Sequence, residues 1–284
     1  MADPSAAFST EPLPQGQRLA LCIEYDGSSY SGWQAQPHLS NVVTVQATLE
    51  DALGAVAAAP VRIHCAGRTD SGVHATAQWV HFDAPAVRSL KNWIVGSNAQ
   101  LPPTIRVVAG ASVTADFHAR HSATARQYDY LIANTPAASA LLAQRALWVR
   151  GALDEQRMHR ALQRILGERD FSAFRAAACQ STTPMRFLAN ARVFRRGAYV
   201  QVRLVANAFL HHMVRNIVGS LLPVGTREAG EEWLEDLLES KDRTKAGATA
   251  PPHGLYLTGV TYPAAFGLPV AAPLPMLFPD AEAL

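Results

Sequence analysis

The residues with the clearest chemical potential form one stretch, Cys-Ala-Gly-Arg-Thr-Asp-Ser-Gly-Val-His-Ala at positions 65–75. Asp70 lies between Gly67 and Gly72, and glycine lets a backbone turn sharply or lie against a ligand. Arg68 precedes Asp70 by two residues, which places both side chains on one side of an extended segment. A guanidinium there would keep the carboxylate ionised at neutral pH. The stretch therefore predicts a carboxylate that is held ready as an anion.

Other interpretations of this stretch are weaker. An aspartate in a glycine-bounded turn most often accepts hydrogen bonds from the amides of its own turn. Asp70 with Ser71 and His74 offers the residue types of a hydrolase triad, but three members within five residues leave little room for an aligned relay. A phosphotransferase usually adds carboxylates near its aspartate to hold magnesium, and Thr69 and Ser71 are not ligands of that kind.

The sequence on either side predicts two strands that position this loop. Val61 and Ile63 alternate with polar residues before it, and Trp79, Val80 and Phe82 follow it. Alternation of apolar and polar residues is typical of a strand with one buried face. Asp70 is therefore expected on a turn between two strands.

The rest of the first half predicts an α+β unit. A half-buried strand over 18–25 leads into a loop over 25–34 that carries two glycines and three aromatic residues. Those rings would either stack on bases or anchor the loop to the core. The further elements are a helix over 45–59 capped by Thr44, a helix over 90–95, and one or two strands within 105–113.

The second half repeats this alternation of strands and helices. Tyr128, Tyr130 and Ile132 share one face of a predicted strand, and 154–166 predicts an amphipathic helix. The remaining elements are a hairpin of strands 189–194 and 199–205, a helix that begins at Phe209, a helix near 233–238, and a final strand that runs through Val260.

The helix expected from Phe209 carries His211, His212 and Arg215. Neighbouring residues on a helix point about 100 degrees apart, so two adjacent histidines cannot easily share an ion, and no metal site is expected. An unpaired guanidinium on this largely apolar helix would be costly. Arg215 therefore needs an anion, which could be Asp70, a phosphate or the partner in an internal ion pair.

Positive charge is concentrated in one part of the chain. Residues 1–116 hold 6 basic and 9 acidic side chains, whereas residues 117–284 hold 19 and 14. The 57 residues of 171–227 contain eight arginines and no carboxylate. Such a block predicts a positive face for a polyanion, because the arginine fork matches phosphate oxygens. The alternative is that acids from elsewhere in the fold pair with these arginines.

Composition indicates a folded intracellular protein. Apolar residues make up 49% of the chain and charged residues 17%, and there is no apolar run of membrane-spanning length. The first 17 residues lack the basic start and apolar middle of a signal peptide. The three cysteines are widely spaced, which favours neither a disulfide framework nor structural zinc. A cytoplasmic protein without a membrane span is therefore expected.

The contiguous letters GRTDSGVHA at 67–75 resemble the active-site signature of the TruA family of tRNA pseudouridine synthases. Four further motifs, at 25–34, 126–128, 171–175 and 250–257, resemble that family in the same order. The resemblance extends over roughly residues 18–262. Five motifs in order make a chance match implausible.

This resemblance implies a fold and an organisation. The fold would be α+β, with two α/β-sandwich-like domains of mainly antiparallel sheets flanked by helices, the pseudouridine synthase fold. The expected parts are a flexible leader at 1–17, a domain at 18–116 with the catalytic aspartate, a domain at 117–262 with a basic RNA-binding surface, and a flexible tail at 263–284.

The resemblance also implies an activity. A homodimer would bind the anticodon stem-loop of tRNA and convert uridine to pseudouridine at positions 38, 39 and 40. Asp70 would be the catalytic residue, Tyr128 would lie against the target base, and Leu255 would form a wall of its pocket. Arg68 or Arg215 would orient Asp70. No cofactor or metal is required, because the reaction involves no redox change and no group transfer to another molecule.

Two points stay open at this level. An ionised carboxylate can add to the uracil ring, attack C1′, or promote loss of a C2′ proton so that a glycal forms, and the sequence does not choose among these routes. An RNA-binding module without catalysis would also account for the arginines and the loop aromatics. It would leave Arg68 and Asp70 without a purpose.

Overall fold

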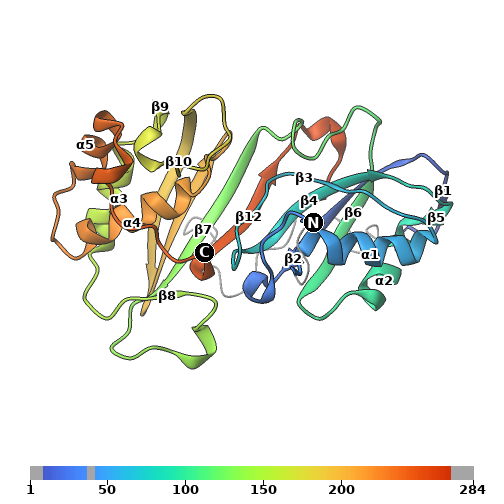
Figure 1. The fold of residues 1–284 in the computed structure, drawn as a ribbon, viewed down its shortest axis with the longest axis horizontal. Coiled ribbons are helices and arrows are strands. Elements are labelled where there is room, and N and C mark those ends of the chain that lie inside the picture. Colours follow the sequence, from blue (N-terminus) through green and yellow to red (C-terminus); the bar gives the residue numbers. More distant parts are fainter. Residues whose placement is uncertain (1–8, 37–41, 270–284) are drawn as a thin grey trace. The chain divides into compact units, whose positions relative to one another are not determined.

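The computed structural model describes residues 9–36 and 42–269, shown as a ribbon in Figure 1. They form two compact units. The N-terminal unit contains the described residues up to 124 together with 257–269, and the C-terminal unit contains 125–256. The predicted domains, 18–116 and 117–262, divide the chain at other positions and stay a prediction.

The N-terminal unit is built on an antiparallel sheet with the strand order β6-β2-β4. The strands are β2 (Arg18–Tyr25), β4 (His74–Asp83) and β6 (Ile105–Ser112), and the short β3 (His64–Cys65) pairs with β4. The predicted loop between two strands is confirmed, because residues 66–73 connect β3 to β4.

Two helices cover one face of this sheet (Figure 1). They are α1 (Val45–Ala57) and α2 (Leu90–Gln100); α2 packs against both α1 and β6. The predicted cap of α1 is confirmed, because Thr44 Oγ1 accepts the Ala47 N–H at 3.3 Å. The Ser89 hydroxyl caps α2 in the same way.

The other face of the sheet is covered by the chain that follows β6. Phe117 and Ala119 pack there with Cys22 and Trp79 in one buried cluster, which Tyr262 also joins. The expectation of a half-buried strand at 18–25 is therefore wrong: Leu19 to Ile23 are all fully buried. The strand has a core on each side, which alternation in the sequence alone did not reveal.

The C-terminal unit is built on a second antiparallel sheet, with the order β7-β11-β10-β9. Its strands are β7 (Ala125–Ala133), β9 (Gly167–Asp170), β10 (Met185–Arg196) and β11 (Tyr199–Ala206). A short β8 (Leu147–Trp148) pairs with β7 in parallel. The predicted hairpin is confirmed as β10 and β11, and Gly197 turns it with φ of +58°.

Three helices pack on this second sheet: α3 (Glu155–Gln163), α4 (Met213–Gly225) and α5 (Trp233–Ser240). Helix α3 packs against β10, and α4 and α5 pack against α3 and against each other. Asp154 caps α3 by accepting the Arg157 N–H at 3.0 Å. Both units are thus helices on a mostly antiparallel sheet, which confirms the α+β class.

The predicted leader and tail contain regular structure where they are described. Pro12–Leu13 forms β1, which pairs with β5 (Arg88–Ser89). At the other end, β12 (Leu255–Thr261) is followed by Phe266, whose ring lies 5.1 Å from that of Phe117. Residues 1–8 and 270–284 lie outside the described residues, and flexibility of the leader and tail stays a prediction. None of the helices in the described part has the length and apolar character of a membrane span.

Candidate active site

Asp70 lies in the N-terminal unit, on the turn between β3 and β4, and its side chain is half-buried. The turn is closed by a hydrogen bond from the Val73 N–H to the Asp70 carbonyl at 3.2 Å. Gly72 adopts φ of +77°, a conformation that side chains disfavour. The backbone conformation of the turn therefore explains why position 72 is a glycine.

The loop after β2 holds the residues on either side of Asp70. The hydroxyls of Tyr25 and Thr69 are hydrogen-bonded at 2.7 Å, and both residues are buried. The Trp33 N–H donates to the Thr69 carbonyl at 3.0 Å. Ser71 Oγ donates to the Tyr30 carbonyl at 3.1 Å. We call these three contacts the Asp70 clasp.

The aromatic residues of this loop anchor it to the core. Tyr25, Tyr30 and Trp33 are all buried, and the Tyr25 and Trp33 ring centroids are 5.8 Å apart. Of the two interpretations of the loop at 25–34, anchoring is therefore the one that the structure supports. The loop acts on the Asp70 turn through hydroxyls and backbone groups.

Two glycines make this close approach possible. A Cβ on Gly27 would overlap the Val73 carbonyl oxygen. Gly32 has φ of +87°, and a Cβ there would lie 3.0 Å from the Thr69 carbonyl oxygen. The two loops therefore touch backbone to backbone, and a side chain at either glycine would move them apart.

Gln78 on β4 supports the start of the turn. Its amide oxygen accepts the Gly67 N–H at 3.3 Å, and its amide nitrogen donates to the Gly67 carbonyl. Gln78 is fully buried, so this pair fixes the backbone just before Arg68. Arg68 itself is exposed, and the predicted pairing of Arg68 with Asp70 stays a prediction.

The other predicted site residues, Tyr128, Arg215 and Leu255, lie in the C-terminal unit. Tyr128 is buried on β7. Its ring packs edge-to-face against the ring of Phe209, with 5.1 Å between the two centroids. No sequence pattern marks Phe209 as a site residue. Tyr130 belongs to the core, because it is buried and its hydroxyl donates to the Pro251 carbonyl at 2.7 Å.

Arg215 is tied to the segment that leads into Leu255. Its Nε donates to the Ala250 carbonyl at 2.8 Å, and the Ala250 N–H donates to the Arg215 carbonyl at 3.1 Å. A backbone carbonyl is thus one of its partners, which the three expected anions did not include. Leu255 is buried at the start of β12. The C-terminal unit therefore fixes the position of Arg215 against the chain that carries Leu255.

Comparison with known proteins bears on these residues together. A family profile described as tRNA pseudouridine synthase matches residues 21–122 and 161–263. The chain belongs to the tRNA pseudouridine synthase family. Tyr128 lies outside the matched segments, and Asp70, Arg215 and Leu255 lie within them.

Full-length relatives agree. The chain is 52% identical to tRNA pseudouridine synthase A of Shewanella amazonensis over 263 residues, which cover 93% of this chain and 100% of the relative. It is 54% identical to the protein of the same name from Histophilus somni over 252 residues, which cover 89% and 93%. As a tRNA pseudouridine synthase, the chain is an isomerase that acts on tRNA.

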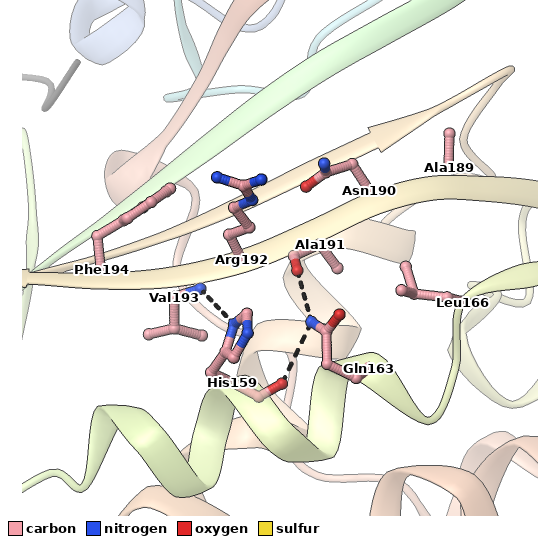
Figure 2. Close-up of a pocket in the computed structure, with 9 residues that line it drawn as sticks. All are labelled: His159, Gln163, Leu166, Ala189, Asn190, Ala191, Arg192, Val193 and Phe194. Atoms are coloured by element: carbon pink, nitrogen blue, oxygen red, sulfur yellow. Dashed lines mark hydrogen bonds between the residues drawn. The ribbon is translucent and has the colours of Figure 1, made fainter. Parts of the chain in front are cut away.

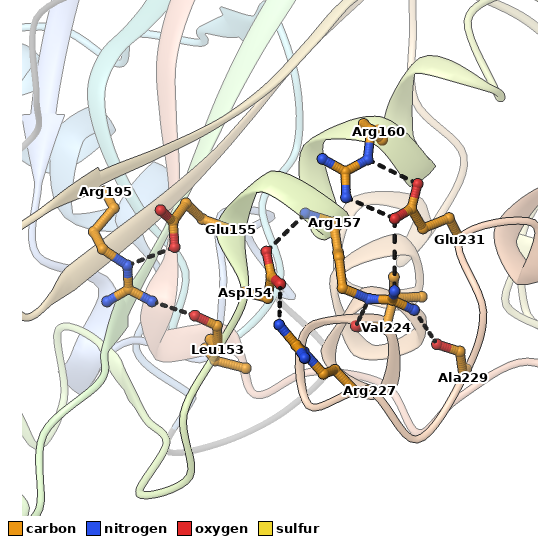
Figure 3. A network of polar contacts seen from close by, with 10 residues as sticks. All are labelled: Leu153, Asp154, Glu155, Arg157, Arg160, Arg195, Val224, Arg227, Ala229 and Glu231. Carbon is orange, nitrogen blue, oxygen red and sulfur yellow. Dashed lines mark hydrogen bonds and ion pairs between the residues drawn. The ribbon is translucent and has the colours of Figure 1, made fainter.

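Three arginines of the block in this synthase pair with acids from elsewhere in the fold, and the positive face for a polyanion stays a prediction. Arg195 bonds Glu155 at 2.7 Å and Arg227 bonds Asp154 at 3.0 Å, both across to α3 (Figure 3). Arg203 lies 2.8 Å from the fully buried Asp129 on β7. All these acids lie outside residues 171–227. The alternative of pairing with distant acids is therefore confirmed for these three arginines.

Two more arginines of the block support its own loops. Arg175 donates to the carbonyls of Cys179 and Ser181 at 2.8 and 2.7 Å. Arg186 is buried and donates to Ser181 Oγ at 2.6 Å and to the Thr183 carbonyl at 3.0 Å. Burial lowers the pKa of Arg186. These side chains hold the loop at 176–185 in place. The N–H groups that bond the loop are not available to a ligand.

His211 and His212 do not lie on a helix, contrary to the expectation. Helix α4 begins at Met213 and not at Phe209, and His212 caps it with φ of +62°. The two histidines therefore precede the helix, and their ring centroids lie only 4.0 Å apart. The left-handed conformation of a non-glycine residue has no strong sequence signal, which is why the start of the helix was misplaced.

A cavity of about 460 Å³ lies between α3 and β10 (Figure 2). His159 Nδ1 accepts the Val193 N–H at 3.4 Å, and Gln163 donates to the Ala191 carbonyl at 2.7 Å. Both side chains thus tie α3 to the strand rather than face a ligand. Its lining contains none of the predicted site residues, and it explains no step of a reaction on tRNA.

Proposed function

We propose that this synthase converts uridine to pseudouridine in the anticodon stem-loop, at positions 38, 39 and 40, with the carboxylate of Asp70 as the catalytic group and without a cofactor. The observation that carries the proposal is the Asp70 clasp. Three contacts and two glycines fix the backbone around one half-buried carboxylate. Several independent contacts to a single turn are typical of a residue that must be held in one geometry.

The isomerisation of uridine requires one well-placed anion. Isomerisation breaks the bond from N1 to C1′, turns the base and joins C5 to C1′, so no electron is gained or lost overall. An ionised Asp70 can begin it by adding to the ring, by attacking C1′, or by promoting loss of the C2′ proton. Each route needs shelter from water, because hydrolysis would otherwise release the base.

The remaining residues hold the base and the carboxylate. Tyr128 lies against the detached uracil and assists removal of the C5 proton, and Leu255 forms a wall of the pocket. The contact with Phe209 supports this role, because it fixes the Tyr128 ring. Arg68 or Arg215 orients Asp70, and the bond of Arg215 to the Ala250 carbonyl supports its fixed position.

The target nucleotide must leave its helix to reach a carboxylate on a protein turn, which is the general solution for enzymes that act on a base. We infer that the working form is a homodimer in the cytoplasm, with tRNA as its substrate. A basic surface of the C-terminal unit contacts the tRNA backbone.

The test is release of tritium from tRNA labelled at C5 of uridine. Asp70→Asn is expected to lower turnover by at least about 1,000-fold while tRNA affinity changes less than about threefold, because charge is lost with little change in shape. Asp116→Asn, an exposed residue of the same unit, is the matched control and should retain full turnover. Turnover retained by Asp70→Asn would refute the role of Asp70.

The same assay separates two rival functions. A wild-type protein that binds tRNA but releases no tritium would be an RNA-binding module. Full activity in excess chelator would count against the magnesium-dependent phosphotransferase chemistry considered for Asp70. Mapping which uridines change in unmodified tRNA tests positions 38, 39 and 40 directly.

A further inference from the structure

Four histidines gather in the N-terminal unit on three separate segments. His64 on β3 is the cross-strand neighbour of His81 on β4, and their ring centroids lie 5.0 Å apart. His118 follows β6, and its ring lies 4.5 Å from that of His81 and 4.3 Å from that of His121. We call these four residues the histidine cluster. The reaction proposed above uses none of them.

Backbone hydrogen bonds fix the tautomers of the two inner rings. His81 Nδ1 accepts the Ala119 N–H at 3.1 Å. His118 Nδ1 accepts the N–H groups of Arg120 and His121 at 3.1 and 3.3 Å. Because each Nδ1 lone pair is used, the neutral ring carries its proton on Nε2. Both Nε2 atoms are therefore hydrogen-bond donors whether or not the ring is charged.

These donors favour an acceptor as the ligand and disfavour a metal. A metal-binding histidine offers the lone pair of one nitrogen and donates the N–H of the other to a neighbour. In His81 and His118 the nitrogen that faces protein accepts, so Nε2 has no lone pair to offer. Over the described residues, no acceptor is bonded to Nε2 of His81 or His118.

The electrostatic surroundings also favour an anion. The charged or titratable groups that influence the pKa of His81 are His64, His118, Arg18 and Asp83. The Asp83 carboxylate forms an ion pair with Arg18 at 2.7 Å. The pKa of His118 is influenced by His121, His64 and Arg18. Burial is the main cause that lowers the pKa of His81 to about 4, and it lowers the pKa of His118 too.

We propose that the histidine cluster is a phosphate-binding site of the N-terminal unit and that its ligand is a phosphodiester of the bound tRNA, an assignment of the ligand that rests on the proposed function. The outer rings of His64 and His121 are exposed and meet the phosphate first. The inner rings donate through Nε2. Binding takes up protons, since a phosphate stabilises the charged form of an exposed imidazole. The inner rings stay neutral, because a proton on Nδ1 would break their bonds to the backbone N–H groups.

The test compares tRNA affinity at about pH 6 and about pH 8, on either side of the ordinary histidine pKa. The wild type is expected to bind about tenfold more tightly at the lower pH, which corresponds to a net uptake of about half a proton on binding. The double variant His64→Gln with His121→Gln should reduce that difference to about twofold or less. Both residues are exposed, so folding is preserved.

The matched control is His159→Gln, a histidine of the C-terminal unit whose Nδ1 also accepts a backbone N–H. It should keep the wild-type dependence on pH. A double variant that retains the full tenfold difference would overturn the proposal. So would equal loss of affinity at both pH values, because the loss would then be independent of proton uptake.

Titration with inorganic phosphate, followed by the NMR shifts of the histidine Cε1 protons, separates the two sources of the ligand. Shifts of the cluster with phosphate, together with pH-linked tRNA binding, support the proposal. Shifts with phosphate but no histidine-dependent tRNA binding assign the site to a free phosphate and refute the tRNA assignment. Stoichiometric binding of zinc that is lost in the double variant would overturn the tautomer argument.

Tritium release in the same samples keeps this inference distinct from the proposed function. If tRNA binding depends on pH and on the histidines but no tritium is released, the phosphate site is supported and the proposed function is refuted. If tritium is released normally but tRNA binding does not depend on the histidines, the proposed function is supported and the phosphate site is refuted.

Discussion

The Asp70 turn and the arginine block use opposite means to hold polar groups in place. The turn is fixed by neutral hydroxyls, backbone groups and the absence of a side chain at Gly27 and Gly32. The block is fixed by charges that meet acids far away in the sequence, such as Arg203 with Asp129. The clasp contacts fix the backbone and the residues next to Asp70 without using a charge, whereas the ion pairs of the block use charge for structure.

This difference explains why one motif pointed to function and the other to stability. The clasp holds the residues next to Asp70, as the proposed binding of a ligand at its carboxylate requires. An arginine within reach of a carboxylate is satisfied without one, and only a fold can supply that partner. The variants below are designed to separate stability from activity in the two regions, and they run from the largest expected effect to the smallest.

Arg203→Met is expected to lower the free energy of unfolding by about 3 to 5 kcal/mol, because it leaves the carboxylate of Asp129 buried without its cation. Chemical denaturation measures the change. Turnover of the fraction that remains folded should be close to that of the wild type. Strong loss of turnover without loss of stability would show that the pair takes part in the reaction.

Gly27→Ala is expected to lower the free energy of unfolding by about 2 to 3 kcal/mol and turnover by more than tenfold, because the new Cβ overlaps the Val73 carbonyl and pushes the clasp from the turn. Gly151→Ala is the matched control, since a Cβ there meets nothing within 4 Å. Unchanged turnover in Gly27→Ala would contradict the role given to the clasp.

Tyr25→Phe removes one contact of the clasp and leaves the Thr69 hydroxyl without it. We expect a loss of about 1 to 2 kcal/mol in stability and a fall in kcat of several-fold with little change in KM, since the turn loosens but the tRNA surface stays. Tyr256→Phe is the control, because its hydroxyl makes a hydrogen bond of the same length, in which it donates to the Arg145 carbonyl at 2.7 Å. It should lose similar stability and keep kcat.

Arg227→Gln is expected to change stability by less than about 0.5 kcal/mol, because this ion pair with Asp154 is largely exposed and screened by solvent. Thermal unfolding at low and high salt measures it. A drop in tRNA affinity much larger than the drop in stability would show that Arg227 contacts the RNA, and would return part of the arginine block to a binding role.

Sequence patterns predicted the elements whose signals are local. Thr44 caps α1 by a contact three residues away, and Gly197 closes the hairpin with a conformation that glycine favours. The Asp70 turn was predictable for the same reason, because its glycines, arginine and aspartate are contiguous. Its resemblance to the family depends on the same contiguity.

What the amino-acid sequence determined alone was the α+β class, the family and the one turn that carries Asp70. Only the tertiary structure decided which arginines are paired, that β2 is buried on both faces, that α4 begins after His212, and that four histidines from three segments meet. The physical reason is distance along the chain. Local hydrogen bonds and periodicity are written in neighbouring residues, whereas burial, ion pairing and ring contacts depend on segments that only folding brings together.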